Sequence, residues 1–140
     1  MKLFTSARIR ELDRYTIEHE PISSSGLMER AADALCDALM GEYPFTVTSF
    51  YIVAGPGNNG GDALALARKL CEQGYPVAAH LIHAATRHSG KGTPVSLSPD
   101  CRLNRDRLKA EFPSVLQEYL DEKADLPLPE HDAVVVDGLF

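Results

Sequence analysis

Apolar residues recur along the chain with two different spacings, one typical of helices and the other of buried strands. In residues 25–40, Leu27, Ala31 and Leu35 lie four positions apart and share one face of a helix. Residues 47–55 instead form a short run of β-branched and aromatic residues, which indicates a buried strand. The same criteria predict further helices over residues 5–19, 61–73 and 100–112, and further strands over residues 76–85, 114–120 and 133–140.

Strands and helices alternate from residue 47 onward, which indicates an α/β fold with a mostly parallel sheet. The 140 residues are enough for one domain. A sheet of this kind normally continues after a buried strand with a loop and another helix, and ligands bind at those strand ends. The chain stops after its last predicted strand, so we expect a single domain, residues 1–140, that is truncated at its C-terminus.

A glycine-rich turn, GPGNNG, joins the first predicted strand to the next helix. Gly55, Gly57 and Gly60 match the pattern G-x-G-x-x-G in the required context of strand, turn and helix. Glycine lets the backbone approach a ligand closely, and the start of a helix offers amides and a partial positive charge. The turn therefore predicts a ligand that carries phosphate.

Two standard interpretations of this turn fail. Enzymes that bind NAD in the ordinary way place an acidic residue about 20 positions further on, for the ribose hydroxyls. Residues 77–88 of this chain contain no Asp or Glu. A P-loop needs Lys followed by Ser or Thr after its last glycine, where this chain has Gly61 and Asp62. The turn is therefore expected to bind its ligand in neither standard way.

The segment NNGGD, residues 58–62, combines two amides, two glycines and a carboxylate at the predicted helix entrance. Amide and carboxylate oxygens are hard ligands, which suit alkali and alkaline-earth cations and sugar hydroxyls. Asp62 taken alone is equally typical of a helix N-cap, and Asn–Gly is common in turns. As a set, the five residues favour a ligand site.

Asp137 is the second candidate, because it follows three valines at the C-terminal end of a predicted strand. Ligands of open α/β sheets bind at such strand ends, where Asp137 would approach Asn59. An aspartate before Gly138 is also typical of a turn, so both interpretations stand.

Charge and composition exclude several functional classes. The net charge is −6 with no basic cluster, which argues against a general nucleic-acid-binding protein. No apolar run approaches the roughly 18 residues of a membrane span, and the N-terminus turns polar too early for a signal peptide. The three cysteines lack a CxxC pattern, so neither disulfides nor structural zinc are expected. We therefore expect a cytoplasmic protein that binds neither membranes nor nucleic acid.

The segment VAGPGNNGGDALALARKL, residues 53–70, resembles the YjeF N-terminal domain family, the NAD(P)H-hydrate epimerases. Three further segments are similar to the family: GLMERAA, SPDCRLNRDRL and HDAVVVDGLF. The resemblance spans nearly the whole chain, and GPGNNGGDA is its most specific part. It implies a three-layer α/β/α Rossmann-like fold.

The resemblance also implies an isomerase of nicotinamide-nucleotide repair. Such enzymes interconvert the R and S forms of NADH or NADPH hydrated at C6 of the nicotinamide ring. A separate or fused dehydratase, which accepts only the S form, then restores the cofactor. The resemblance further implies a homodimer and a bound potassium ion.

The family pattern implies a role for six residues of this chain. It places potassium on Asn59 and Asp137. It places the substrate contacts on five consecutive residues, Asn58, Asn59, Gly60, Gly61 and Asp62. Asp62 is the only acid in the glycine turn, so we expect it to act as the catalytic proton-transfer group.

The chain departs from the family pattern at its end. The family continues with a second glycine-rich loop, and later with an Asp and a Ser that complete the substrate and potassium sites. We therefore expect the 140-residue chain to be poorly active. A non-catalytic nucleotide-binding or protein-interaction module is the alternative, although the intact NNGGD segment favours an enzyme. A nucleotide-dependent kinase is a weaker alternative, because the Lys and Ser/Thr of a P-loop are missing.

Overall fold

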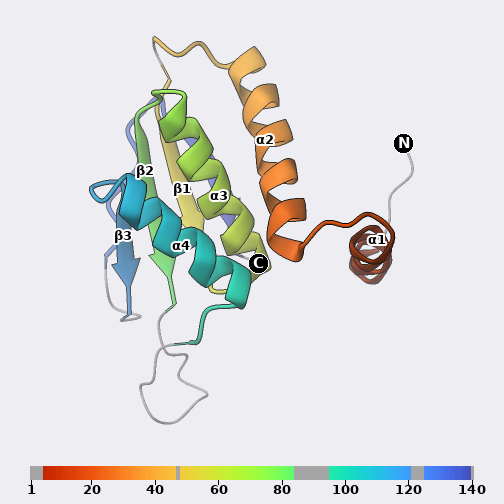
Figure 1. Ribbon diagram of the computed structural model, residues 1–140. Helices are drawn as coiled ribbons and strands as arrows, with labels where there is room; N and C mark the ends of the chain where they lie inside the picture. Colours follow the sequence, from red (N-terminus) through yellow and green to blue (C-terminus); the bar gives the residue numbers. More distant parts are fainter. Residues whose placement is uncertain (1–4, 47, 84–94, 121–124, 140) are drawn as a thin grey trace.

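The predicted helices and strands are all present in the structure, a computed structural model that describes residues 5–46, 48–83, 95–120 and 125–139 (Figure 1). In chain order they are α1 (Ser6–His19), α2 (Ser24–Glu42), β1 (Phe50–Ala54), α3 (Asn58–Glu72), β2 (Val77–Ile82), α4 (Pro99–Glu111), β3 (Leu116–Tyr119) and β4 (Val134–Gly138). None of the helices in these ranges is long and apolar enough to cross a membrane. The predicted α/β class is confirmed.

The four strands form one parallel sheet in the order β3-β2-β1-β4. The strand order reverses at β1, because β2 and β3 extend from one of its edges and β4 pairs with the other. In this register Val53 lies beside Asp137 and Ala54 beside Gly138. The carboxyl ends of β1 and β4 therefore meet at the switch point, where open α/β sheets bind ligands.

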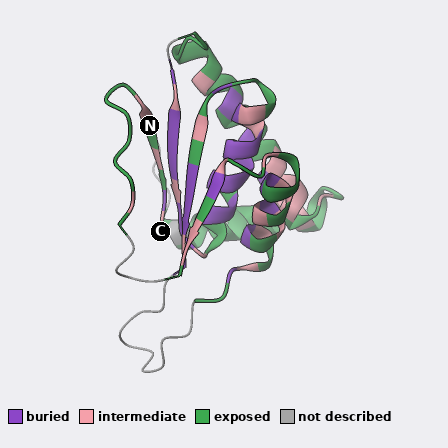
Figure 2. Ribbon diagram, turned by 90° about the vertical axis from the view of Figure 1, so that its left-hand side faces the viewer, coloured by how far each residue is buried: buried purple, intermediate pink, exposed green. Residues whose placement is uncertain are grey.

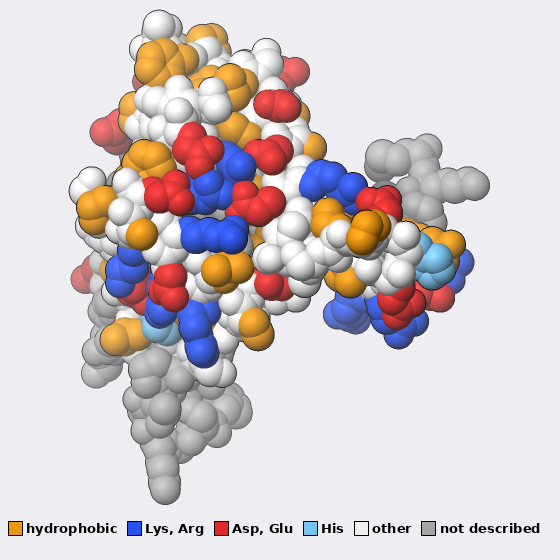
Figure 3. All heavy atoms as spheres, in the orientation of Figure 1, with side chains coloured by type: hydrophobic (Ala, Val, Ile, Leu, Met, Phe, Trp, Pro, Cys, Tyr) orange, Lys and Arg blue, Asp and Glu red, His pale blue; other side chains and the backbone are white. Residues whose placement is uncertain are grey.

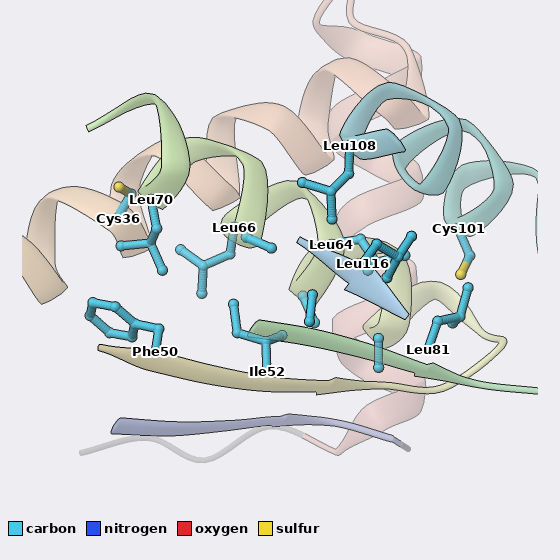
Figure 4. Packing of buried hydrophobic residues seen from close by; sticks show 14 of the residues in the cluster. Cys36, Phe50, Ile52, Leu64, Leu66, Leu70, Leu81, Cys101, Leu108 and Leu116 are labelled. Atoms are coloured by element: carbon cyan, nitrogen blue, oxygen red, sulfur yellow. The ribbon is translucent and has the colours of Figure 1, made fainter. Parts of the chain in front are cut away.

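Helices α2, α3 and α4 lie on one face of the sheet (Figures 1 and 2). The described residues thus supply one of the two helical layers that a three-layer fold requires. The core fills the space between this layer and the sheet. Figure 4 shows Leu66 and Leu70 of α3 pointing toward Phe50 and Ile52 of β1, and all four side chains are buried.

Side-chain caps begin three of the helices, and α3 is the exception. Thr5, Ser23 and Ser98 each accept a hydrogen bond from a backbone amide in the first turn of α1, α2 and α4. At the start of α3 the N-cap is Gly57, which has no side chain to serve that purpose. The amides at this end of α3 are therefore left to other partners, because the first turn of a helix cannot satisfy its own donors.

Helix α1 stands away from the sheet beside the start of α2 (Figure 1). Two of its large apolar side chains are largely uncovered, since Ile9 and Leu12 are 48% and 46% exposed. Ile17 is half-buried and faces a cavity between α1, α2 and α3. The helix therefore contributes more to this cavity than to the core.

Glu29 of α2 joins the three core-facing helices through ion pairs. Its carboxylate lies 2.5 Å from Arg68 and 3.3 Å from Lys69, both on α3, and 2.9 Å from Arg107 on α4. Figure 3 shows basic and acidic side chains interleaved over this helical surface. Burial alone would raise the pKa of the Glu29 carboxyl, but the hydrogen bonds and charges of Arg68 and Lys69 hold it below its ordinary value.

We expect Glu29→Gln to lower the free energy of unfolding by about 2 kcal/mol at pH 7, because the Glu29 side chain is only 22% exposed and holds three cations. The wild-type advantage is present above the ordinary pKa of 4.5 and is lost as the pH falls through the lower native value. Urea denaturation at several pH values measures both effects.

Glu20→Gln is the matched control, because Glu20 pairs with Arg30 at 2.8 Å but both side chains are 54% exposed. We expect it to change the free energy of unfolding by less than about 0.5 kcal/mol. Equal losses in the two variants would show that Glu29 does not hold the helices together.

Candidate functional site

The glycine turn between β1 and α3 is attached to two other elements. The amide of Gly55 donates to the carbonyl oxygen of Gly138 at 3.0 Å, which joins the turn to the end of β4. The carbonyl oxygen of Pro56 accepts from the amide of Ser98 at 2.8 Å, which joins it to the start of α4. The buried Cys101 thiol adds a weak hydrogen bond to the carbonyl oxygen of Gly55 at 3.5 Å. The turn is thus held where β1, β4, α3 and α4 meet.

The three glycines of the predicted fingerprint serve two different purposes. A Cβ atom on Gly60 would lie 1.8 Å from the carbonyl oxygen of Gly55, and one on Gly55 would lie 2.3 Å from that of Leu139. These two glycines are therefore required by backbone packing. A Cβ atom on Gly57 would meet no described atom within 4 Å. Gly57 leaves open space at the start of α3, where a ligand's phosphate can approach the backbone.

The start of α3 corrects one interpretation of Asp62. The helix begins at Asn58, three residues earlier than predicted, so Asp62 is its fifth residue and not its N-cap. The reason is that Gly57 adopts the extended N-cap conformation, with φ −86° and ψ −167°, and both asparagines continue as helix. Asn58 and Asn59 therefore lie one turn before Asp62, on either side of the same helical face.

Asn59 and Asp137 meet in a hollow beside β4, as predicted. This β4-side hollow has a volume of about 190 Å³. Its lining residues come from α2, α3 and β4 and are Leu35, Asn59, Asp62, Ala63, Leu66, Val136, Asp137 and Gly138. It lies at the carboxyl end of β4, where the strand order places the ligand crevice.

Asp137 also shows the turn role that the sequence left open. Its Oδ1 accepts a hydrogen bond from the amide of Leu139 at 2.9 Å. The other carboxylate lone pairs are not used by that bond, because an ionised carboxylate accepts about four hydrogen bonds. Asp137 can therefore shape the turn and still present oxygen to the hollow.

A second, larger cavity opens on the other side of Asp62. This α1-side cavity has a volume of about 420 Å³. It is enclosed by α1, α2 and the start of α3, and its lining residues are Arg10, Asp13, Arg14, Ile17, Ser24, Leu27, Met28, Ala31, Asn58 and Asp62. Asp62 lines both spaces, so it lies between them.

The environment of Asp62 disfavours its charged form, although its side chain reaches solvent. Desolvation by the surrounding side chains, and then the nearby carboxylates of Asp13 and Asp100, raise the pKa of Asp62 from 3.8 to about 6. A carboxyl group with a pKa in this range exists in both forms near neutral pH. Asp62 is therefore suited to proton transfer.

Cys101, which bonds to the glycine turn, is not a candidate nucleophile. The Cys101 thiol is buried, and burial raises its pKa to about 11, so it is protonated near neutral pH. Among the described residues, no three or more His, Cys, Asp and Glu side chains gather closely enough to hold a metal ion. The candidate cation donors are therefore oxygen atoms of a different set, led by the Asn59 amide and the Asp137 carboxylate.

Sequence reasoning missed the α1 side of this site. Arg10, Asp13 and Arg14 are separated from the glycine turn by more than forty positions in the sequence. They show no motif of their own, and their contribution depends on how α1 packs. The alternation of charges along α1 is typical of a solvent-exposed helix, which gave no signal of a site.

Residues 24–140 match the family described as "YjeF-related protein N-terminus". The chain belongs to this family. The segment NNGGD at the start of α3 and Asp137 at the end of β4 both lie within the matched residues. The resemblance noted on the sequence is thereby confirmed.

Curated members of this YjeF-related family resemble the chain over part of their length. An NAD(P)H-hydrate epimerase of Limosilactobacillus reuteri is 42% identical over 140 residues, which are 99% of this chain and 58% of the relative. An NAD(P)H-hydrate epimerase of Rhodobacter capsulatus is 35% identical over 112 residues, which are 76% of this chain and 49% of the relative. The chain thus spans about half the length of these relatives.

A solved structure of similar fold is the crystal structure of yeast ynu0, YNL200c. Its TM-score is 0.69 at 20% identity, and the match covers 100% of this chain and 57% of that chain. At this identity the match supports the fold of the YjeF-related domain alone.

We expect Gly60→Ala to lower the free energy of unfolding by about 3 kcal/mol or more, because the backbone of α3 or of the turn must move to admit the Cβ atom. Gly57→Ala, at the open position, is expected to cost less than about 1 kcal/mol. Urea denaturation followed by circular dichroism compares the two. Similar losses would contradict the tight packing of Gly60.

We expect Asp62→Asn to raise the free energy of unfolding at pH 7. The folded-state pKa of about 6 lies above the ordinary 3.8, so the wild type loses stability as the pH rises from about 4 to above 6. The difference between variant and wild type should therefore vanish below about pH 4. Thermal unfolding across this pH range measures it.

Asp37→Asn is the control for that experiment, because Asp37 is exposed on α2 and makes no ion pair with other described residues. Its effect on stability at pH 7 should stay within about 0.5 kcal/mol. If Asp62→Asn is no more stable than the wild type at pH 7, the pKa of Asp62 is not raised in the folded protein.

Proposed function

We propose that the chain contributes the active site of an NAD(P)H-hydrate epimerase, an isomerase that interconverts the R and S forms of NADH or NADPH hydrated at C6. The observation that carries the proposal is the convergence of Asn59, Asp62 and Asp137 on one hollow beside the uncapped start of α3. The curated relatives named NAD(P)H-hydrate epimerase support it.

The start of α3 suits the phosphates of a dinucleotide. Gly57 leaves its first amides approachable, and the helix end carries a partial positive charge. A dinucleotide bound there would extend toward Asp62, which lies one turn further along α3. The reacting ring is thereby brought to a group that can transfer protons.

Epimerisation at C6 needs a proton donor and acceptor but no net oxidation. In one route the protonated Asp62 gives its proton to the C6 hydroxyl, which leaves as water while the ring nitrogen donates its electron pair to C6. Water then returns on the other face of the ring and gives a proton back to the Asp62 carboxylate. A pKa of about 6 suits both steps, because each form of the carboxyl group is populated near neutral pH. In the other route the C6 hydroxyl gives its proton to the Asp62 carboxylate, the bond between C6 and the ring nitrogen breaks, C6 becomes an aldehyde and the nitrogen takes up a proton. These transfers reverse when the ring recloses on the other face of the aldehyde.

A potassium ion fits the β4-side hollow by its chemistry. Asn59 and Asp137 line the same hollow and supply an amide and a carboxylate, which are hard donors. The backbone carbonyl oxygens of Asn59 and Val53 lie beside Gly138 at the same place. Such an ion would supply a fixed positive charge for anionic parts of the substrate. We propose that Asn59 and Asp137 hold it.

We also propose how the protein works with others. Its substrate is a damaged form of a cytoplasmic cofactor, so we place the protein in the cytoplasm beside a dehydratase, either separate or fused. Association as a homodimer is supported by large apolar side chains that remain exposed on three described elements, Leu12 on α1, Leu35 on α2 and Val135 on β4.

The proposal is tested by following the interconversion of the R and S forms of NADPH hydrate in potassium, against the spontaneous rate. We expect the chain to accelerate it, and Asn59→Ala to reduce the acceleration at least about tenfold, as the loss of one charge-assisted contact would. Replacing potassium with choline should have a similar effect on the wild type.

Gln73→Ala is the matched control, because it removes an exposed amide at the opposite end of α3. It should leave the rate unchanged. A folded chain without activity, which also stays inactive when lengthened to the size of its relatives, would overturn the enzyme and favour a binding module.

A further inference from the structure

Two arginines of α1 face the start of α3 across the α1-side cavity. Arg10 and Arg14 lie one helical turn apart, so they project from the same side of α1. Both line the cavity together with Asn58 and Asp62 of α3. Its volume of about 420 Å³ lies within the usual range of ligand pockets, roughly 300–1,000 Å³.

Arg10 and Arg14 form fewer and weaker ion pairs than the neighbouring arginines do. Arg8 of α1 pairs with Glu11 at 2.7 Å, and Arg30 of α2 pairs with Glu20 at 2.8 Å. Arg14 approaches Glu18 only to 3.9 Å, with both side chains largely exposed, which is a weak interaction. Arg10 makes no ion pair with any described residue. The two arginines that line the cavity therefore have the weakest ties to neighbouring carboxylates and can pair with a ligand.

The cavity also contains two carboxylates, which limit where an anion can bind. Asp13 lies on α1 between the arginines in sequence, and Asp62 lies on α3. Both would repel a phosphate placed beside them but would accept hydrogen bonds from sugar hydroxyls. A phosphorylated ribose presents both kinds of group. Its phosphate would lie against the arginines, whose planar forks match phosphate oxygens.

We propose that Arg10 and Arg14 bind a phosphate group of the dinucleotide substrate in the α1-side cavity, so that the substrate lies across Asp62 between α1 and β4. This inference rests on the proposed function for the identity of the ligand. It assigns α1 a binding role that would offset the missing ribose acid at the end of β2. The phosphate is either part of the pyrophosphate or, in NADPH, the one on the adenosine ribose.

The test compares the affinities of the 140-residue chain for NADPH and NADH by titration calorimetry. We expect the double variant Arg10→Gln/Arg14→Gln to bind NADPH about tenfold or more weakly, the change expected for the loss of a charge-assisted contact. Arg8→Gln is the control, because it removes an arginine charge from the same helix outside the cavity. It should change the affinity less than about twofold.

The second ligand identifies the phosphate. A loss confined to NADPH would assign the arginines to the phosphate on the adenosine ribose, and an equal loss for both would assign them to the pyrophosphate. Affinities equal to those of Arg8→Gln for both ligands, or a wild type that binds neither, would overturn the inference. Unfolding curves of each variant establish that it is folded.

The proposed function fails in a distinguishable way. A chain that binds NADPH through Arg10 and Arg14 but does not interconvert the hydrates would overturn the epimerase and leave this binding site in place. If the chain interconverts the hydrates and binds NADPH equally well with and without the two arginines, the arginine site is overturned. The proposed epimerase then stands.

Discussion

The approach of the α3 backbone to the end of β1 is the contact on which the rest of the site depends. Gly60 lies so close to the carbonyl oxygen of Gly55 that no side chain fits between them, and Gly55 is in turn held by the end of β4. This packing fixes the direction in which α3 leaves the sheet. It brings Asn59 to Asp137 and leaves the first turn of the helix open beside Gly57. A larger residue at either packed position would separate the parts of the site before it altered any of them chemically.

Two carboxylates on neighbouring helices show how the fold divides structural from chemical roles. Glu29 is surrounded by Arg68, Lys69 and Arg107, so its charge is stabilised and it joins three helices. Asp62 faces other carboxylates and has no ion-pair partner among the described residues, so its charge is disfavoured. The same type of group is thus rigid and ionised in one place and ready to exchange a proton in the other. Ionisable groups with a strongly shifted pKa, such as Asp62, are typical of functional sites.

The order of helices and strands could be predicted from the sequence. So could the β4 side of the site, which consists of the local motifs around NNGGD and Asp137. Apolar patterning predicts every described strand, and the position of Asp137 after three valines predicts its place at the switch point. The start of α3 was predicted too late, because asparagine and glycine are poor helix formers and their context overrode that preference.

The α1 side of the site could not be predicted, because it depends on tertiary packing alone. Arg10 and Asp13 meet Asp62 only where α1 turns back beside α2, and nothing in their local spacing indicates a ligand. The same holds for the pKa of Asp62, since its three causes come from different elements. Long-range packing of this kind leaves no local pattern to read.

The parallel pairing of β4 with β1 has a consequence for how the protein is made. β4 joins β1 only after α3, β2, α4 and β3 have been synthesised, because all four lie between the two strands in the chain. Until then the amide of Gly55 lacks the carbonyl oxygen of Gly138, and Asn59 lacks Asp137. The helices and the first two paired strands can form on the ribosome, since proteins fold progressively from the N-terminus. A nascent chain halted before residue 134 would therefore hold most of this core but would lack the β4 wall of the β4-side hollow.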